Sequence, residues 1–133
     1  MTPSPDAVPP EATLSEARAQ MANARIRHLP VIEGDGSLVG IVSERDLALL
    51  ESMGASSDRA VRDAMNVPFT CGPEAQLHAV ATKMSENRFG SAVIVDPESP
   101  SKVLGIFTTV DALRAIIQLT QPYLMDPTSS AGD

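Results

Sequence analysis

The sequence predicts an α/β fold in which a helix–strand–strand–helix unit occurs twice and the two copies pack sheet to sheet with pseudo-twofold symmetry. Three observations support this prediction. Residues 10–14 (PEATL) reappear as 73–77 (PEAQL), and 40–46 (GIVSERD) reappear as 105–111 (GIFTTVD), which indicates a duplicated unit. The apolar content of 43% is enough for a core. A unit of roughly 50 residues buries too little surface alone, so each copy needs the other.

Local patterns predict each element of the first copy. Thr13 followed by Glu16 predicts a capping box at the start of a helix. Residues 29–32 predict a short strand. After a glycine-containing turn, residues 38–42 predict its partner, which is apolar throughout and therefore expected to be buried on both faces. Ser43 then predicts the cap of a second helix.

The second copy repeats this order. Apolar residues at helical spacing begin at Leu77, strands are expected near 92–96 and 103–107, and a helix is expected from about 109 to 119. The turn between the two strands is longer than its counterpart in the first copy. A structural repeat tolerates a length change best in a turn.

The segment between the copies is expected to carry a short helix and an edge strand. Asp58 predicts the cap of a connecting helix that runs to Met65. Residues 67–70 (VPFT) predict a strand at a sheet edge, because proline cannot donate to a central ladder. Val8 and Pro9 form its weaker counterpart in the first copy.

These patterns divide the chain into four segments. We expect a disordered tail over 1–7, a first repeat over 8–57, a second repeat with its connecting helix over 58–123, and a disordered tail over 124–133. Both tails are rich in Pro, Ser, Thr, Gly or Asp, and terminal residues of this composition are poorly ordered unless they are tied down.

Charge and composition exclude several classes of function. The chain has 10 Lys and Arg against 17 Asp and Glu, a net charge of −7, which argues against a surface for nucleic acid polymers. Aromatic residues, at 3%, are too few for a base-stacking platform. No apolar run approaches the roughly 18 residues of a membrane span, and no signal-peptide pattern is found. The single Cys71 fits a reduced, cytoplasmic setting.

One motif occurs at matching positions in both copies: Gly, two apolar residues, Ser or Thr, two variable residues, then Asp. A hydroxyl followed three residues later by an acid is an ordinary helix start. The same geometry suits a ligand, because a helix N-terminus binds phosphate and an Asp one turn inside can accept hydrogen bonds from a ribose. The residues alone leave both interpretations open. The residues of the motif are Gly40, Ser43, Asp46, Gly105, Thr108 and Asp111.

With these motifs the repeat resembles the cystathionine β-synthase (CBS) domain, and the two copies resemble a CBS pair, or Bateman module, from about residue 8 to 120. Residues 25–31 (RIRHLPV) and the turn at 35–36 (DG) add to the similarity. The resemblance implies tandem CBS repeats that bind adenosine-containing ligands in clefts between the repeats. In this family the ligands are AMP, ADP or ATP, and in some members S-adenosylmethionine or NAD.

The resemblance also implies roles for the motif residues. Asp46 and Asp111 would hold the ribose, and Ser43 and Thr108 would hold phosphate. Arg45, inside the first motif, would reach a phosphate or pair with acidic neighbours on the surface, and both alternatives stay open.

Basic residues precede the first strand of the first copy only. By the resemblance, Arg27 and His28 would meet nucleotide phosphates, although a partly buried, purely structural role is an equal alternative. The second copy has Gly90 and Ser91 at these positions and brings no cation there. We therefore expect the two clefts to differ in their affinity for phosphate.

The short strand before the second copy implies, by the same resemblance, an adenine pocket formed by Thr70, Cys71 and Ala92. Main-chain contacts there would not depend on side-chain identity, and Cys71 is explained more simply as a small buried apolar residue. The sequence contains no catalytic constellation and no metal-ligand spacing.

The sequence therefore predicts a non-catalytic regulatory module that senses an adenosine-containing ligand, requires no cofactor and acts in trans on an unidentified protein partner. The second hypothesis is a dimerisation or interaction module with degenerate nucleotide sites, and the third is a small enzyme. A homodimer formed through apolar helix faces is also expected. The candidate contact residues are Leu47, Leu50, Met53, Ala112, Ile116 and Leu119.

Overall fold

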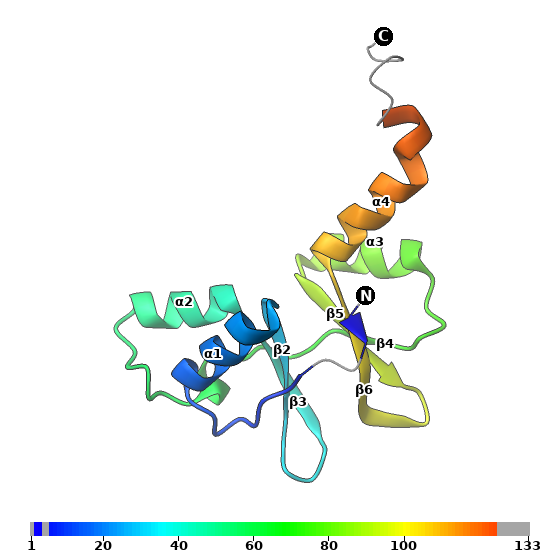
Figure 1. Ribbon diagram of the computed structural model, residues 1–133. Helices are drawn as coiled ribbons and strands as arrows, with labels where there is room; N and C mark the ends of the chain where they lie inside the picture. The colour runs from blue at the N-terminus through cyan, green and yellow to red at the C-terminus, as the bar shows by residue number, and fades with distance from the viewer. Residues whose placement is uncertain (1, 4–5, 125–133) are drawn as a thin grey trace.

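The computed structural model describes residues 2–3 and 6–124 of the chain, which fold into helices and two small sheets (Figure 1). The helices are α1 (Leu14–Ala24), α2 (Glu44–Ser52), the 3-10 helix η1 (Val61–Asp63), α3 (Leu77–Asn87) and α4 (Thr109–Leu124). The strands are β1 (Thr2–Pro3), β2 (His28–Ile32), β3 (Leu38–Ser43), β4 (Thr70–Cys71), β5 (Ser91–Asp96) and β6 (Ser99–Thr108).

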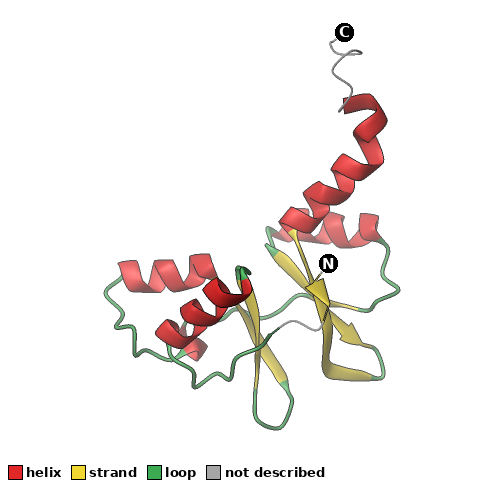
Figure 2. Cartoon of the chain, viewed as in Figure 1, coloured by secondary structure: helices red, strands yellow, loops and turns green. Residues whose placement is uncertain are grey.

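The two halves of the chain have the same order of helices and hairpin strands. Antiparallel hairpins β2–β3 and β5–β6 form the centre of each half, and Figure 2 shows them side by side. In the first half α1 contacts β2 and α2 contacts β3, while in the second half α3 contacts β5 and α4 contacts β6. Strand β3 contacts β6, so the two sheets meet between the halves. This confirms the predicted tandem α/β repeat.

The short parallel strand of the second half has a counterpart at the equivalent position of the first half. In the second half β4 pairs with β5 in parallel, with Cys71 opposite Ile94, at the edge of a sheet with the order β1-β6-β5-β4. In the first half Val8 forms a parallel bridge to Val31 at the corresponding position. The predicted edge strand is therefore present, but it begins only at Thr70. Residues 67–69 of the predicted range lie outside it.

The apolar core is larger in the first half. Its fully buried side chains come from α1, both strands and α2, and include Leu14, Leu29, Val42 and Leu47. The burial of Leu47 contradicts its predicted place on an exposed dimer face. On α2 it is Leu49, not Leu47, that is exposed.

Strand β3 is less buried than predicted. Gly40 and Val42 are buried, but Leu38, Val39 and Ile41 remain partly accessible. The reason is that Val42 faces the core beneath the helices, whereas Ile41, on the other face, lines a cleft between the halves. The apolar run of β3 is therefore buried on one face of the sheet only, and its other face borders the cleft.

The connection between the halves is less helical than predicted. The expected helix over 58–65 is only the single-turn η1, which begins after Ala60 and has no side-chain cap, so Asp58 does not cap it. The physical reason is that Ala60 bridges to Thr13 and the Val61 N–H donates to the Ala12 carbonyl at 2.7 Å. These contacts hold Ala60 in an extended conformation, so the helical turn begins only at Val61.

The two ends of the chain also differ from expectation. Residues 2–3 form β1, which pairs with Gly105 and Ile106 of β6, where a disordered tail over 1–7 was predicted. This pairing covers what would otherwise be an open sheet edge. Helix α4, predicted to end near 119, continues to Leu124 and projects away from the sheets (Figure 1). Residues 1, 4–5 and 125–133 lie outside the described part, so the rest of the two predicted tails, and the division at 57–58, stay predictions.

Candidate functional site: two clefts between the repeats

Two clefts open between the halves of the molecule. The α2 cleft, of about 690 Å³, is lined by the motif residues Ser43 and Asp46 of the first repeat and by residues 88–91 of the second. The α4 cleft, of about 460 Å³, is lined by the motif residues Thr108 and Asp111 of the second repeat and by residues 25–28 of the first. Each cleft therefore combines the motif of one repeat with the segment before the first hairpin strand of the other.

The motif of the first repeat lies where β3 passes into α2. The Ser43 N–H donates to Asp46 Oδ2 at 2.8 Å, and the Asp46 N–H donates to Ser43 Oγ at 3.1 Å. The next N–H, of Glu44, donates to the carbonyl of Arg27 at 2.9 Å. This is the capping box that the sequence predicts, and it holds a hydroxyl and a carboxylate side by side at the wall of the α2 cleft.

The motif of the second repeat has the same arrangement where β6 passes into α4. The Thr108 N–H donates to Asp111 Oδ2 at 2.9 Å, and the Asp111 N–H donates to Thr108 Oγ1 at 3.3 Å. The Thr109 N–H donates to the carbonyl of Gly90 at 3.2 Å, as Glu44 does to Arg27. Capping a helix and facing a cleft are thus not alternatives, because the same side chains do both.

The arginines divide into two groups. The chain has eight, and five of them line the clefts. The other three each form an ion pair: Arg18 with Glu51, Arg59 with Asp63 and Arg62 with Glu11. Within residues 6–124 none of the five cleft arginines has an ion-pair partner. These are Arg25, Arg27, Arg45, Arg88 and Arg114.

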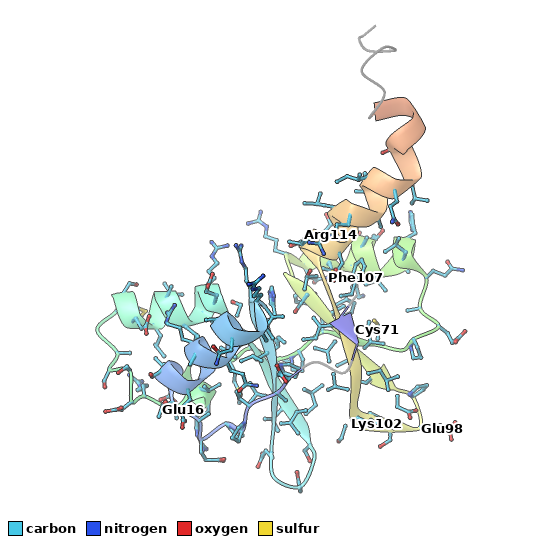
Figure 3. All side chains as sticks on the ribbon, in the orientation of Figure 1. Glu16, Cys71, Glu98, Lys102, Phe107 and Arg114 are labelled. Atoms are coloured by element: carbon cyan, nitrogen blue, oxygen red, sulfur yellow. The ribbon has the colours of Figure 1, made fainter. Side chains whose placement is uncertain are left out.

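The clefts differ in charge. In the α2 cleft, Arg27, Arg45 and Arg88 face two carboxylates, those of Glu44 and Asp46. Among the described residues that line the α4 cleft, three arginines face one carboxylate, that of Asp111, since Arg25 and Arg114 join Arg27 there. Figure 3 shows Arg114 near the start of α4. The α4 cleft is therefore the more positive of the two.

His28 stands between the two clefts and lines both. Burial lowers the pKa of His28, the nearby Asp46 carboxylate opposes this, and the Arg27 guanidinium adds to the lowering. Its Nε2 atom lies against the backbone of the second repeat, because a Cβ built on Gly90 would approach Nε2 to 3.3 Å.

The sequence predictions missed three of the cleft arginines. Arg25 and Arg88 occupy equivalent positions just after α1 and α3, each in the left-handed conformation with φ of 57°. Their recurrence in the repeat was the available signal. Arg88 brings a cation to the second copy two residues before Gly90, although Gly90 and Ser91 themselves carry none, as the sequence indicated. Arg114 lies one turn beyond the motif and carried no signal of its own.

The three residues predicted to form an adenine pocket do not line the two clefts. Neither Thr70, Cys71 nor Ala92 lines either cleft. Ala92 is fully buried in the core, and Cys71 borders a separate hollow of about 170 Å³ with Phe107, both labelled in Figure 3. Burial raises the pKa of the Cys71 thiol.

Residues earlier in the same segment line the α2 cleft. The chain crosses from β3, where Asn66 pairs with Ile41, to the edge of the second sheet, and Asn66, Val67 and Phe69 line the α2 cleft on the way. Phe69 stacks on Phe89, with ring centroids 5.1 Å apart and an interplanar angle of 25°. This pair gives the α2 cleft an aromatic wall.

The duplicated fold and its two inter-repeat clefts define a class of tandem α/β repeat proteins. The model of the CBS domain family matches residues 1–51 and 61–118, and the chain belongs to this family. In the part of the chain that the structure describes, no helix is long and apolar enough to cross a membrane.

Two solved structures have the same fold. The CBS domain pair of protein MJ0100, in complex with 5′-methylthioadenosine and S-adenosyl-L-methionine, is 25% identical with a TM-score of 0.76, over 86% of this chain and 90% of that one. CBSX2 of Arabidopsis thaliana, in complex with AMP, is 27% identical with a TM-score of 0.71, over 90% of this chain and 94% of that one.

Curated relatives are larger proteins. Inosine-5′-monophosphate dehydrogenase of Thermoplasma acidophilum is 31% identical over 106 residues, which cover 80% of this chain but 20% of that protein. The chain therefore spans about a fifth of the length of such relatives.

Proposed function

We propose that this chain is a regulatory module that binds phosphorylated adenosine ligands, of the AMP, ADP or ATP class, in its two clefts. One observation carries the proposal. In a chain with a net charge of −7, the arginines without an ion-pair partner in residues 6–124 all line these clefts. Exposed cations gathered in a cleft of an acidic protein attract an anionic ligand and bind its phosphate through charge-assisted hydrogen bonds.

The proposed roles follow the geometry of each cleft. Asp46 and Asp111 accept hydrogen bonds from the ribose hydroxyls, and Ser43 and Thr108 contact the phosphate at the helix N-termini. The arginines of each cleft neutralise the phosphate. Support comes from relatives of the same fold, one bound to AMP and one to 5′-methylthioadenosine and S-adenosyl-L-methionine.

The two clefts would favour different parts of such a ligand. The stacked pair Phe69 and Phe89 in the α2 cleft offers an apolar face for adenine. In the α4 cleft the corresponding position holds Ile26, beside Arg25 and Arg114. We therefore expect the α4 cleft to prefer ligands with more phosphate groups and the α2 cleft to tolerate less charged ones, such as S-adenosylmethionine.

The module is proposed to be non-catalytic, to need no cofactor and to act in trans on a partner protein in the cytoplasm. Ligand binding between the halves would bias their relative packing, and a partner that senses this packing would respond. The alternative is an interaction module with degenerate nucleotide sites. The apolar residues exposed on α4, among them Leu113, Ile116 and Leu119, favour that alternative.

Isothermal titration and thermal melting with AMP, ADP, ATP and S-adenosylmethionine test the proposal. A ligand at a hundredfold excess over its Kd should stabilise the fold by about 2.7 kcal/mol. Asp46→Asn and Asp111→Asn each keep a hydrogen-bond acceptor for the cap but lose the charge. Each should weaken binding at its own cleft by roughly tenfold or more, since hydrogen bonds to charged groups contribute about 1.5–3 kcal/mol.

The matched control is Glu16→Gln, which alters the capping box of α1, outside both clefts, in the same way. It should leave ligand affinity unchanged. If none of the four ligands produces heat or a thermal shift, the nucleotide-sensing proposal fails and the interaction module replaces it.

A further inference from the structure

The two clefts have two residues in common that carry nitrogen donors. Arg27 and His28 line both the α2 cleft and the α4 cleft. The other cleft arginines serve one cleft each: Arg45 and Arg88 line the α2 cleft only, and Arg25 and Arg114 the α4 cleft only. Thr109 also lines both clefts, but it carries no charge, so Arg27 is the one arginine among these five that the clefts share.

The position of this segment is fixed by its backbone. The Arg27 carbonyl accepts the Glu44 N–H at 2.9 Å, and His28 pairs with Ser43 at the start of β2. The Arg27 side chain itself is exposed and has no ion-pair partner in the described residues. A fixed backbone with an unpaired guanidinium can turn toward an anion on either side.

The second repeat has small residues where the first repeat has Arg27 and His28. Gly90 and Ser91 occupy the positions equivalent to Arg27 and His28, and the Gly90 carbonyl accepts the Thr109 N–H as the Arg27 carbonyl accepts that of Glu44. A Cβ on Gly90 would lie 3.3 Å from His28 Nε2, closer than an ordinary van der Waals contact. A side chain at position 90 would therefore crowd His28.

We propose that Arg27 and His28 form one phosphate-binding element shared by both clefts, so that a ligand in one cleft weakens binding in the other. This inference rests on the proposed nucleotide function and goes beyond it. One guanidinium can form its strongest, bidentate contact with only one phosphate group at a time. The second ligand must bind without that contact and beside a negative charge already in place, and linkage makes the effect reciprocal.

Titration with AMP, followed by the amide N–H resonances of Arg45 and Val110, tests the proposal. These residues line the α2 cleft and the α4 cleft respectively, so each resonance reports one cleft. The variant Asp111→Asn weakens binding in the α4 cleft. It should therefore shift the AMP titration curve of the Arg45 resonance to lower AMP concentration. The variant Asp46→Asn weakens binding in the α2 cleft and should likewise shift the AMP titration curve of the Val110 resonance to lower AMP concentration. Couplings between sites are typically about 5- to 150-fold, and we expect a shift of about tenfold.

The variant Arg27→Ala identifies the shared element. It should weaken AMP binding at both reporters and abolish the shifts caused by Asp46→Asn and Asp111→Asn. The matched controls Arg88→Ala and Arg114→Ala should each weaken binding at one reporter only and leave the coupling in place. Because Arg27 is exposed and its structural hydrogen bond uses the main chain, the variant is expected to fold, and its melting curve checks this.

The outcomes separate this inference from the function on which it rests. If AMP binds at both reporters but Arg27→Ala affects only one, or if disabling one cleft leaves the other curve unmoved, the shared element is wrong while nucleotide binding stands. If AMP, ADP, ATP and S-adenosylmethionine all fail to bind, the proposed function itself is wrong.

Discussion

Single residues at the clefts serve the fold and the site at once. Ser43 and Asp46 close the first turn of α2 with reciprocal hydrogen bonds, and they also face the cleft. Replacing such a cap residue by Ala costs about 1 kcal/mol of stability before any ligand is added. Variants at these positions therefore need a measurement of stability beside every measurement of binding.

His28 should make the stability of the protein depend on pH. Its pKa is lowered in the folded state, mainly by burial, from the usual histidine value of 6.5. As the pH falls below 6.5, His28 of the unfolded chain is protonated before His28 of the folded protein, so the free energy of unfolding decreases. The decrease ends once the pH lies below the folded pKa. Urea unfolding at pH 7.5 and 5.5 should show lower stability at pH 5.5.

The variant His28→Gln isolates this contribution. It should lose less stability than the wild type between the two pH values, because the group that titrates is gone. His78→Gln removes an exposed histidine of α3 and serves as the control. An identical pH dependence in His28→Gln and the wild type would contradict the prediction.

At the scale of elements, the close approach of the connecting segment to β3 depends on one glycine. A Cβ on Gly40 would lie 2.6 Å from Met65 Sδ and 3.0 Å from Met65 Cβ. Next to this contact Asn66 and Ile41 exchange two hydrogen bonds of 2.9 Å. The glycine of the motif thus lets the segment pass against β3 on its way to the α2 cleft.

The variant Gly40→Ala should therefore destabilise the fold by about 1–3 kcal/mol, the usual cost of overpacking. Chemical denaturation measures the change. In a Met65→Ala background the same substitution should cost less, because the closest atom, Met65 Sδ, is absent and only the contact with Cβ remains. Gly34→Ala, where a Cβ meets nothing within 4 Å, is the matched control. Equal costs at Gly40 in both backgrounds would argue against this contact.

At the scale of the whole molecule, α4 presents an unusual surface. It contacts β6 near its start and projects beyond the sheets (Figure 1). Leu113, Ile116, Ile117 and Leu119 are all at least half exposed. A lone helix of this length is only marginally stable in water, and apolar patches on a surface mark interaction sites.

We therefore expect a homodimer in solution that buries this helix. Light scattering at micromolar concentration should give the mass of two chains. Ile116→Lys should shift the equilibrium toward the monomer, because it introduces a charge into the buried face. Ser85→Lys adds the same charge at an exposed site on α3 and should leave the dimer intact. A wild-type protein of monomeric mass would refute the expectation.

Local patterns in the sequence were enough for the elements and for the duplication. The capping boxes at Thr13 and Ser43, the two hairpins and the paired motifs depend on contacts between residues near in the chain, and such contacts leave a readable spacing. The same patterns failed at Asp58 and along β3. There the outcome depended on distant partners, Ala12 for the connecting segment and the cleft for Ile41.

The sequence by itself determined that this protein is a tandem repeat with a hydroxyl–carboxylate pair at two helix N-termini. Only the tertiary structure decided which residues face those pairs: the segment of the opposite repeat, with Arg25 and Arg88, the aromatic wall of Phe69 and Phe89, and Arg27 between the clefts. The physical reason is that a cleft between repeats is created by the way two sheets pack together. That packing is a sum of long-range contacts, and periodicity within one element carries no information about it.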